Sequence, residues 1–164
     1  MRIGHYPEHR SENKGSEPEG IAYGRYGKDD LLFVGAERAN VVAVYDVDRL
    51  RRPRLLQVLP STVGPEGLLP IPSHNLFVVA SEVDDRGDKI RSSITIYKRT
   101  GARSTYPTVE SVNTGPAGCR VPITWGALSA LAAHPWFPWV AYTAHDSAYN
   151  EARIYTLLVG GKNS

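Results

Sequence analysis

The sequence is poor in cysteine, in long apolar runs and in net charge. Its single cysteine, Cys119, excludes an internal disulfide and any zinc site built from several cysteines. The 19 basic and 17 acidic residues leave a formal charge of +2, which gives the chain no electrostatic reason to bind nucleic acid. No segment is apolar over the length of a membrane span, and residues 1–20 are polar, without the apolar stretch that a signal peptide would have. We therefore expect no nucleic acid partner, no membrane span, and a cytoplasmic location for the chain as written.

What the chain does contain is an internal repeat with a period of roughly 50 residues. Two copies share a Pro-Glu-Gly start, an apolar run that ends in glutamate, and a β-branched strand that contains tyrosine. They occupy residues 17–46 and 64–98, and a weaker third copy occupies residues 130–156. Strand triplets repeated at this period are typical of proteins that are built from blades.

Each copy divides into short strands that are bounded by glycine, proline and acidic turn residues. The first copy predicts strands over residues 20–26, 31–36, 41–47 and 54–59, and the second over 68–71, 75–80, 92–98 and 108–112. The expected fold class is all-β. The expected architecture is a partial β-propeller with two four-stranded antiparallel blades and an incomplete third.

The composition divides the chain further. We expect an N-terminal arm over 1–16, two blades over 17–113, a Gly- and Pro-rich linker over 114–124, a third unit over 125–159 and a tail over 160–164. A propeller ring needs four to eight blades, so this chain cannot close a ring alone. The expected partners are the remaining blades or another copy of the chain.

The motifs of residues 15–99 closely resemble the last blades of the choice-of-anchor I type β-propeller domain. The residues that carry the resemblance are Glu17-Pro18-Glu19-Gly20-Ile21, Phe33-Val34-Gly35-Ala36-Glu37-Arg38, Val44-Tyr45-Asp46, Gly64-Pro65-Glu66-Gly67-Leu68, Val78-Val79-Ala80-Ser81-Glu82 and Thr95-Ile96-Tyr97. The resemblance implies a secreted, periplasmic or surface-located bacterial parent.

A second resemblance covers residues 122–156, which look like the opening blade of the esterase-like phytase family. Its motifs are Trp125-Gly126-Ala127-Leu128-Ser129, Asp146-Ser147-Ala148-Tyr149 and Arg153-Ile154-Tyr155. Together the two resemblances imply a fragment from the junction of two propellers in an exported protein. The parent would hydrolyse phosphoesters or esters, and the chain alone would be inactive. The alternative is a non-catalytic binding or interaction module.

Four glutamates fall at equivalent places in the first two copies. They are Glu19, Glu37, Glu66 and Glu82. In a propeller such positions lie side by side, and clustered carboxylates suit Ca²⁺, which phytase-like propellers use to hold phosphate. The alternative is structural: Glu19 and Glu66 bond backbone amides in the turn that enters each blade, and Arg38 neutralises Glu37.

No catalytic residue can be assigned from the sequence. His145-Asp146-Ser147 are neighbours on an extended segment whose side chains alternate between faces, so they do not form a triad. Asp146 and Ser147 are instead expected to be rim or turn residues. The aromatic run of residues 136–139 is expected to plug an outer strand connection, with sugar stacking as the alternative.

Overall fold

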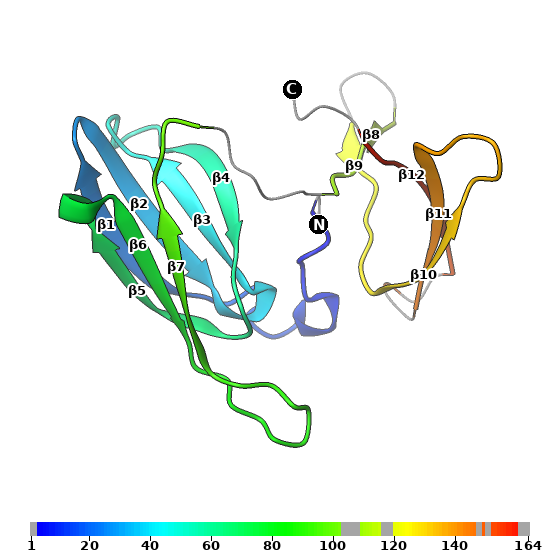
Figure 1. Ribbon diagram of the computed structural model, residues 1–164, viewed down its shortest axis with the longest axis horizontal. Coiled ribbons are helices and arrows are strands. Elements are labelled where there is room, and N and C mark those ends of the chain that lie inside the picture. Colours follow the sequence, from blue (N-terminus) through cyan, green and yellow to red (C-terminus); the bar gives the residue numbers. More distant parts are fainter. Residues whose placement is uncertain (1–2, 103–108, 116–119, 147–148, 150–151, 161–164) are drawn as a thin grey trace. The chain divides into compact units, whose positions relative to one another are not determined.

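The computed structural model describes residues 3–102, 109–115, 120–146, 149 and 152–160, so Cys119 and Ser147 lie outside the described residues. These parts contain 12 strands in four antiparallel sheets and no α-helix (Figure 1). The all-β prediction is therefore confirmed, whereas the partial propeller stays a prediction. Within the same residues, no helix is long and apolar enough to span a membrane.

The chain forms two compact units. The double-sheet unit is His9–Pro107, and the terminal unit combines Met1–Glu8 with Thr108–Ser164. A one-turn 3₁₀ helix, η1 (Glu8–Arg10), lies at the boundary between the two units. Each unit is described by itself below.

The first sheet of the double-sheet unit has four consecutive antiparallel strands. They are β1 (Pro18–Tyr26), β2 (Asp29–Ala36), β3 (Val41–Asp46) and β4 (Arg54–Pro60). A 3₁₀ turn, η2 (Glu37–Ala39), connects β2 to β3, and Asn40 follows it in the left-handed conformation with φ 54°. Asparagine tolerates this conformation better than most residues. All four strands lie where the sequence predicted them.

The second sheet has three antiparallel strands. They are β5 (Pro65–Ile71), β6 (Leu76–Ser81) and β7 (Ser93–Lys98), and η3 (Pro72–His74) connects the first two. These strands agree with the predicted ones at 68–71, 75–80 and 92–98.

The predicted fourth strand over 108–112 is wrong for residues 109–112, which form no strand; Thr108 lies outside the described residues. Ser111 and Val112 bond Ile123 instead. The Ile123 N–H donates to the Val112 carbonyl at 3.2 Å, and the Ser111 hydroxyl donates to the Ile123 carbonyl. Directly after them, β8 (Asn113–Thr114) pairs with β9 (Val121–Pro122) inside the predicted linker. This competing partner removes the segment from β7.

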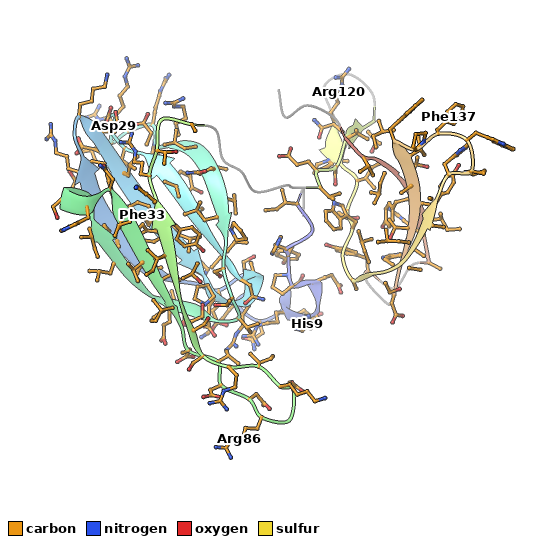
Figure 2. All side chains as sticks on the ribbon, in the orientation of Figure 1. His9, Asp29, Phe33, Arg86, Arg120 and Phe137 are labelled. Atoms are coloured by element: carbon orange, nitrogen blue, oxygen red, sulfur yellow. The ribbon has the colours of Figure 1, made fainter. Side chains whose placement is uncertain are left out.

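The two sheets of the double-sheet unit pack face to face through aromatic rings (Figure 2). Phe33 of β2 stacks on Phe77 of β6 with ring centroids 4.0 Å apart, and Tyr97 lies 5.9 Å beyond. Leu68 packs beside them over two glycines: a Cβ at Gly20 would lie 3.1 Å from Leu68, and one at Gly35 would lie 3.4 Å from it. Each large apolar side chain buried in this core contributes about 1.5–3 kcal/mol.

The terminal unit contains one sheet of three antiparallel strands, β10 (Leu128–Ala133), β11 (Val140–His145) and β12 (Ile154–Leu158). Thr143 and His145 are the buried side chains of this sheet among the described residues. Leu131, Ile154 and Leu158 are each at least three-quarters exposed. This sheet therefore has much less of a core than the first two.

The aromatic run between β10 and β11 does not plug the connection, so that prediction is wrong. Trp136 is 79% exposed and Trp139 is 56% exposed. His134 holds this tight loop: its Nδ1 accepts the backbone N–H groups of Trp136 and Phe137 at 3.2 Å, and its own backbone N–H donates to the Val140 carbonyl at 3.0 Å. The loop therefore holds the rings out from the sheet, and sugar stacking stays a prediction.

Candidate functional site

The first strand of each large sheet begins with the same backbone device. One extra residue bulges out of the first strand, at Glu19 in β1, Glu66 in β5 and Ser129 in β10. Two residues before the bulge, the chain has a positive φ, of 50° at Glu17, 73° at Gly64 and 45° at Ala127. We call this device the opening turn.

A single backbone hydrogen bond closes each opening turn. The acidic residue after the second strand donates its N–H to the carbonyl of the residue with positive φ, at 3.0, 3.0 and 2.9 Å. The donors are Glu37, Glu82 and Asp146, and the acceptors are Glu17, Gly64 and Ala127. The acidic residue that the repeat predicted thus has the same structural position in all three sheets, including that of the weaker third copy.

The four predicted glutamates meet in two pairs. Glu19 and Glu37 share a hydrogen bond, and burial followed by this bond raises the pKa of Glu37. Glu66 and Glu82 share another, which is the main cause that raises the pKa of Glu66. Two carboxylates that share a proton repel each other once both are ionised. The charge of Glu19 also contributes to the raised pKa of Glu66, so the two pairs are electrostatically linked.

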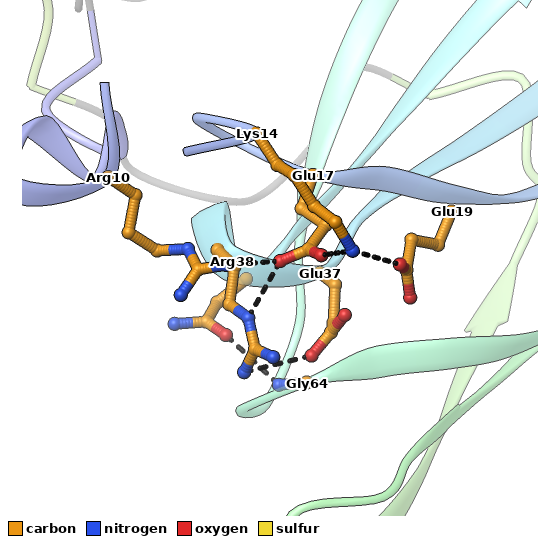
Figure 3. Close-up of polar contacts among 8 residues, drawn as sticks. Arg10, Lys14, Glu17, Glu19, Glu37, Arg38 and Gly64 are labelled. Carbon is orange, nitrogen blue, oxygen red and sulfur yellow. Dashed lines mark hydrogen bonds and ion pairs between the residues drawn. The ribbon is translucent and has the colours of Figure 1, made fainter. Parts of the chain in front are cut away.

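The sequence analysis missed Glu17, which is the most constrained carboxylate of this cluster (Figure 3). Its side chain is only 5% exposed and binds three cations: Arg10 at 2.8 Å, Lys14 at 2.5 Å and Arg38 at 3.0 Å. The hydrogen bonds from Lys14 and then Arg38 lower the pKa of Glu17 to about 2. Comparison of the three copies could have indicated this role, because the first copy has a glutamate at the position where the second has Gly64 and the third has Ala127.

Two of the same cations reach a second carboxylate each. Arg38 binds Glu37 at 3.0 Å, as the structural alternative expected, and Lys14 lies 3.6 Å from Glu19. Oxygens of Glu17, Glu19 and Glu37 lie within 4.8 Å of one another. Glu19 and Glu37 are thus partly neutralised by the cations that bind Glu17, and Glu66 and Glu82 are not part of this group of three. Oxygen donors alone suit Ca²⁺.

The described residues of the terminal unit do not assemble a catalytic group. His145 packs edge-on against Tyr155, with centroids 5.5 Å apart, and its buried ring nitrogens have no hydrogen-bond partner among the described residues. No acid there orients the imidazole as a general base. Asp146 occupies the opening turn, and the rim role predicted for Ser147 concerns a residue outside the described ones.

Comparison with protein families now supports one of the two resemblances. Residues 3–50 match the family model of the choice-of-anchor I domain. The matched residues run from η1 through β3 and include Glu17, Glu19 and Glu37. The match suggests a protein family that is anchored at the cell surface. No curated protein and no solved structure matches the chain. The resemblance to esterase-like phytases is supported by no match and stays a prediction.

Proposed function

We propose that the three large sheets are blades of a β-propeller in an exported, surface-located protein, where this chain serves as a structural and interaction module. The supporting observation is the opening turn, which recurs with the same bulge and the same closing hydrogen bond in all three sheets. Radial repetition of one sheet type is how propellers are built. The face-to-face packing of Phe33 on Phe77 is the contact expected between neighbouring blades.

The DNA on both sides of this reading frame tests the proposal. We expect it to encode further strand triplets that begin with a Pro-Glu-Gly or related opening turn, enough to bring the ring to four to eight blades. Flanking genes without such triplets would contradict the propeller. A signal peptide upstream would support export.

We further propose that the paired carboxylates of Glu19 with Glu37 and of Glu66 with Glu82 together bind one Ca²⁺ ion. A divalent cation would replace the shared protons and remove the repulsion within each pair. Millimolar calcium should then raise the thermal midpoint by about 2–4 °C, the shift that 1 kcal/mol of binding gives in a chain of this size. Magnesium, which demands a tighter octahedral site, should do less.

The matched variants for this titration are Glu66→Gln and Glu12→Gln. Glu66→Gln removes one carboxylate from a pair and should abolish the calcium shift. Glu12 is exposed in the turn before the cluster, so Glu12→Gln should keep the shift. If calcium leaves the wild-type midpoint unchanged, the four glutamates are structural residues.

The same carboxylate pairs favour a second candidate, in which the parent propeller hydrolyses phosphate esters or carboxylic esters with calcium. A metal held by four carboxylates could polarise a phosphate oxygen. The test is turnover of p-nitrophenyl phosphate and p-nitrophenyl acetate by the purified chain with calcium or with chelator. Calcium-dependent turnover that Glu66→Gln abolishes would support hydrolysis, and its absence would leave the module without catalysis.

A further inference from the structure

The double-sheet unit exposes apolar side chains on both of its outer faces. On the outer face of the first sheet, Ile21 is 69% exposed and Tyr23 is 58% exposed. On the outer face of the second sheet, Leu69, Ile94 and Ile96 are each 57–64% exposed. Large exposed apolar patches mark surfaces that associate. We call these surfaces the first-sheet face and the second-sheet face.

The repeat relates these two faces to the interface that the unit already contains. Pro18 and Gly20 correspond to Pro65 and Gly67, because the opening turns coincide in register. Ile21 therefore corresponds to Leu68, which packs against the first sheet. By the same alignment, the exposed first-sheet face is equivalent to the buried face of the second sheet.

The converse also holds. Val42 and Val44, which are buried in the core, correspond to the exposed Ile94 and Ile96 of the second sheet. The second-sheet face is thus equivalent to the buried face of the first sheet. A chain whose two free faces correspond to the two sides of its own internal interface can repeat that interface between copies.

We infer that the second-sheet face of one copy binds the first-sheet face of a second copy, head to tail. In the internal interface Leu68 lies over Gly20 and Gly35. The equivalent contact places Ile21 of the second copy over Gly67 and Ala80, where the small residues leave room for it. Leu32 of the second copy would likewise lie on Val78, as Phe77 lies on Phe33. The inference deepens the proposed function, because it rests on the sheets being equivalent blades.

Such an interface is heterologous, so one copy can bind a neighbour on each side and the assembly can grow or close into a ring. This property separates it from a symmetric contact between two identical faces. Two variants, each blocked on one face, distinguish the cases. Ile21→Glu places a charge on the first-sheet face, and Ile96→Glu places one on the second-sheet face; Ile94→Glu is the second choice for the latter.

The experiment is sedimentation velocity of the full chain from micromolar to near-millimolar concentration. Wild type should grow in mass with concentration, and each variant alone should stay monomeric. An equal mixture of Ile21→Glu and Ile96→Glu should double in mass, because one free face of each kind remains. Leu50→Glu is the matched control, since Leu50 is 84% exposed on the turn between β3 and β4, and should associate like wild type.

Three results would overturn the inference. The first is a wild type that is monomeric at every concentration, and the second is a single variant that dimerises alone. The third is self-association that neither variant weakens, which would mean that the copies contact each other through the terminal unit. Circular dichroism melts of each variant are the control for folding. The proposed function is tested separately, because it would be contradicted by flanking DNA that encodes no further blades. If the chain is monomeric but the flanking DNA does encode blades, only the self-association is contradicted.

Discussion

The double-sheet unit and the sheet of the terminal unit begin with the same opening turn but differ in how much they bury. The double-sheet unit encloses Phe33, Val42, Phe77 and Val79 at 4% exposure or less. The three-stranded sheet of the terminal unit leaves Ile154 and other apolar side chains exposed on its strands. Its opening turn nevertheless closes at 2.9 Å.

The difference separates two levels of folding. The opening turn is formed by residues at the adjoining ends of one pair of strands, so a single sheet can form it. A core depends on a second sheet that supplies the other half of the contact, because an apolar face stabilises the fold only when it is removed from water. The predictions below test whether this distinction holds.

The largest expected effect is in the aromatic stack. Phe77→Ala leaves a cavity against Phe33 and should lower the free energy of unfolding by about 3–5 kcal/mol. Ile154→Ala, at a 79% exposed position of the terminal sheet, should change it by about 0.5 kcal/mol or less. Urea denaturation followed by circular dichroism measures both. Similar losses for the two substitutions would mean that the terminal sheet has a core of its own.

The opening turn should respond in opposite directions in the two units. At Gly64 an added Cβ would lie 2.6 Å from a methyl group of Val83 and φ is +73°, so Gly64→Ala should cost at least about 1–2 kcal/mol. Ala127 already has a positive φ of 45°, so Ala127→Gly should gain up to about 1 kcal/mol. Gly101→Ala is the control because nothing lies within 4 Å of the added Cβ. Destabilisation by Ala127→Gly would show that its opening turn is not strained.

A smaller, pH-dependent effect is expected at Glu17. Since its pKa falls from 4.5 to about 2 in the folded chain, Glu17 stabilises the fold above pH 4.5 and loses that contribution as the pH falls toward 2. Glu17→Gln should therefore be less stable than wild type at pH 6, and the gap should narrow between pH 4.5 and 2. The raised pKa of Glu66 makes stability change with pH in the opposite direction, but Glu66 is present in both proteins. Its contribution therefore cancels when the stability of the variant is subtracted from that of wild type. Parallel stability curves for the two proteins would rule out this role of Glu17.

The positions of the strands could be predicted because the signal is local. Alternation and turn residues place β1 to β7 and the third copy near their observed bounds, and the repeat places Glu37, Glu82 and Asp146 at equivalent positions. The repeat also predicted that Glu19, Glu37, Glu66 and Glu82 lie side by side, and a shared calcium site among all four stays a prediction. None of these features depends on which other segments of the chain the strands contact.

The missed features all depend on segments without a period. Arg10 and Lys14 lie in a polar stretch whose sequence shows no regular element, so their convergence on Glu17 could not be read from spacing. Residues 109–112 carry an acceptable strand pattern, but Ile123 competes for Ser111 and Val112. Choices between competing partners are decided by tertiary contacts, which local propensity does not encode.

Amide hydrogen exchange at Glu37, Glu82 and Asp146 tests most directly whether one opening turn is used in three sheets. Because each of these N–H groups donates the closing hydrogen bond, all three should exchange more slowly than loop amides such as that of Gly101. Asp146 should be the least protected, since its sheet buries few apolar side chains among the described residues. Exchange of Asp146 at the rate of Gly101, or of Glu82 well ahead of Glu37 and Asp146, would contradict the shared design.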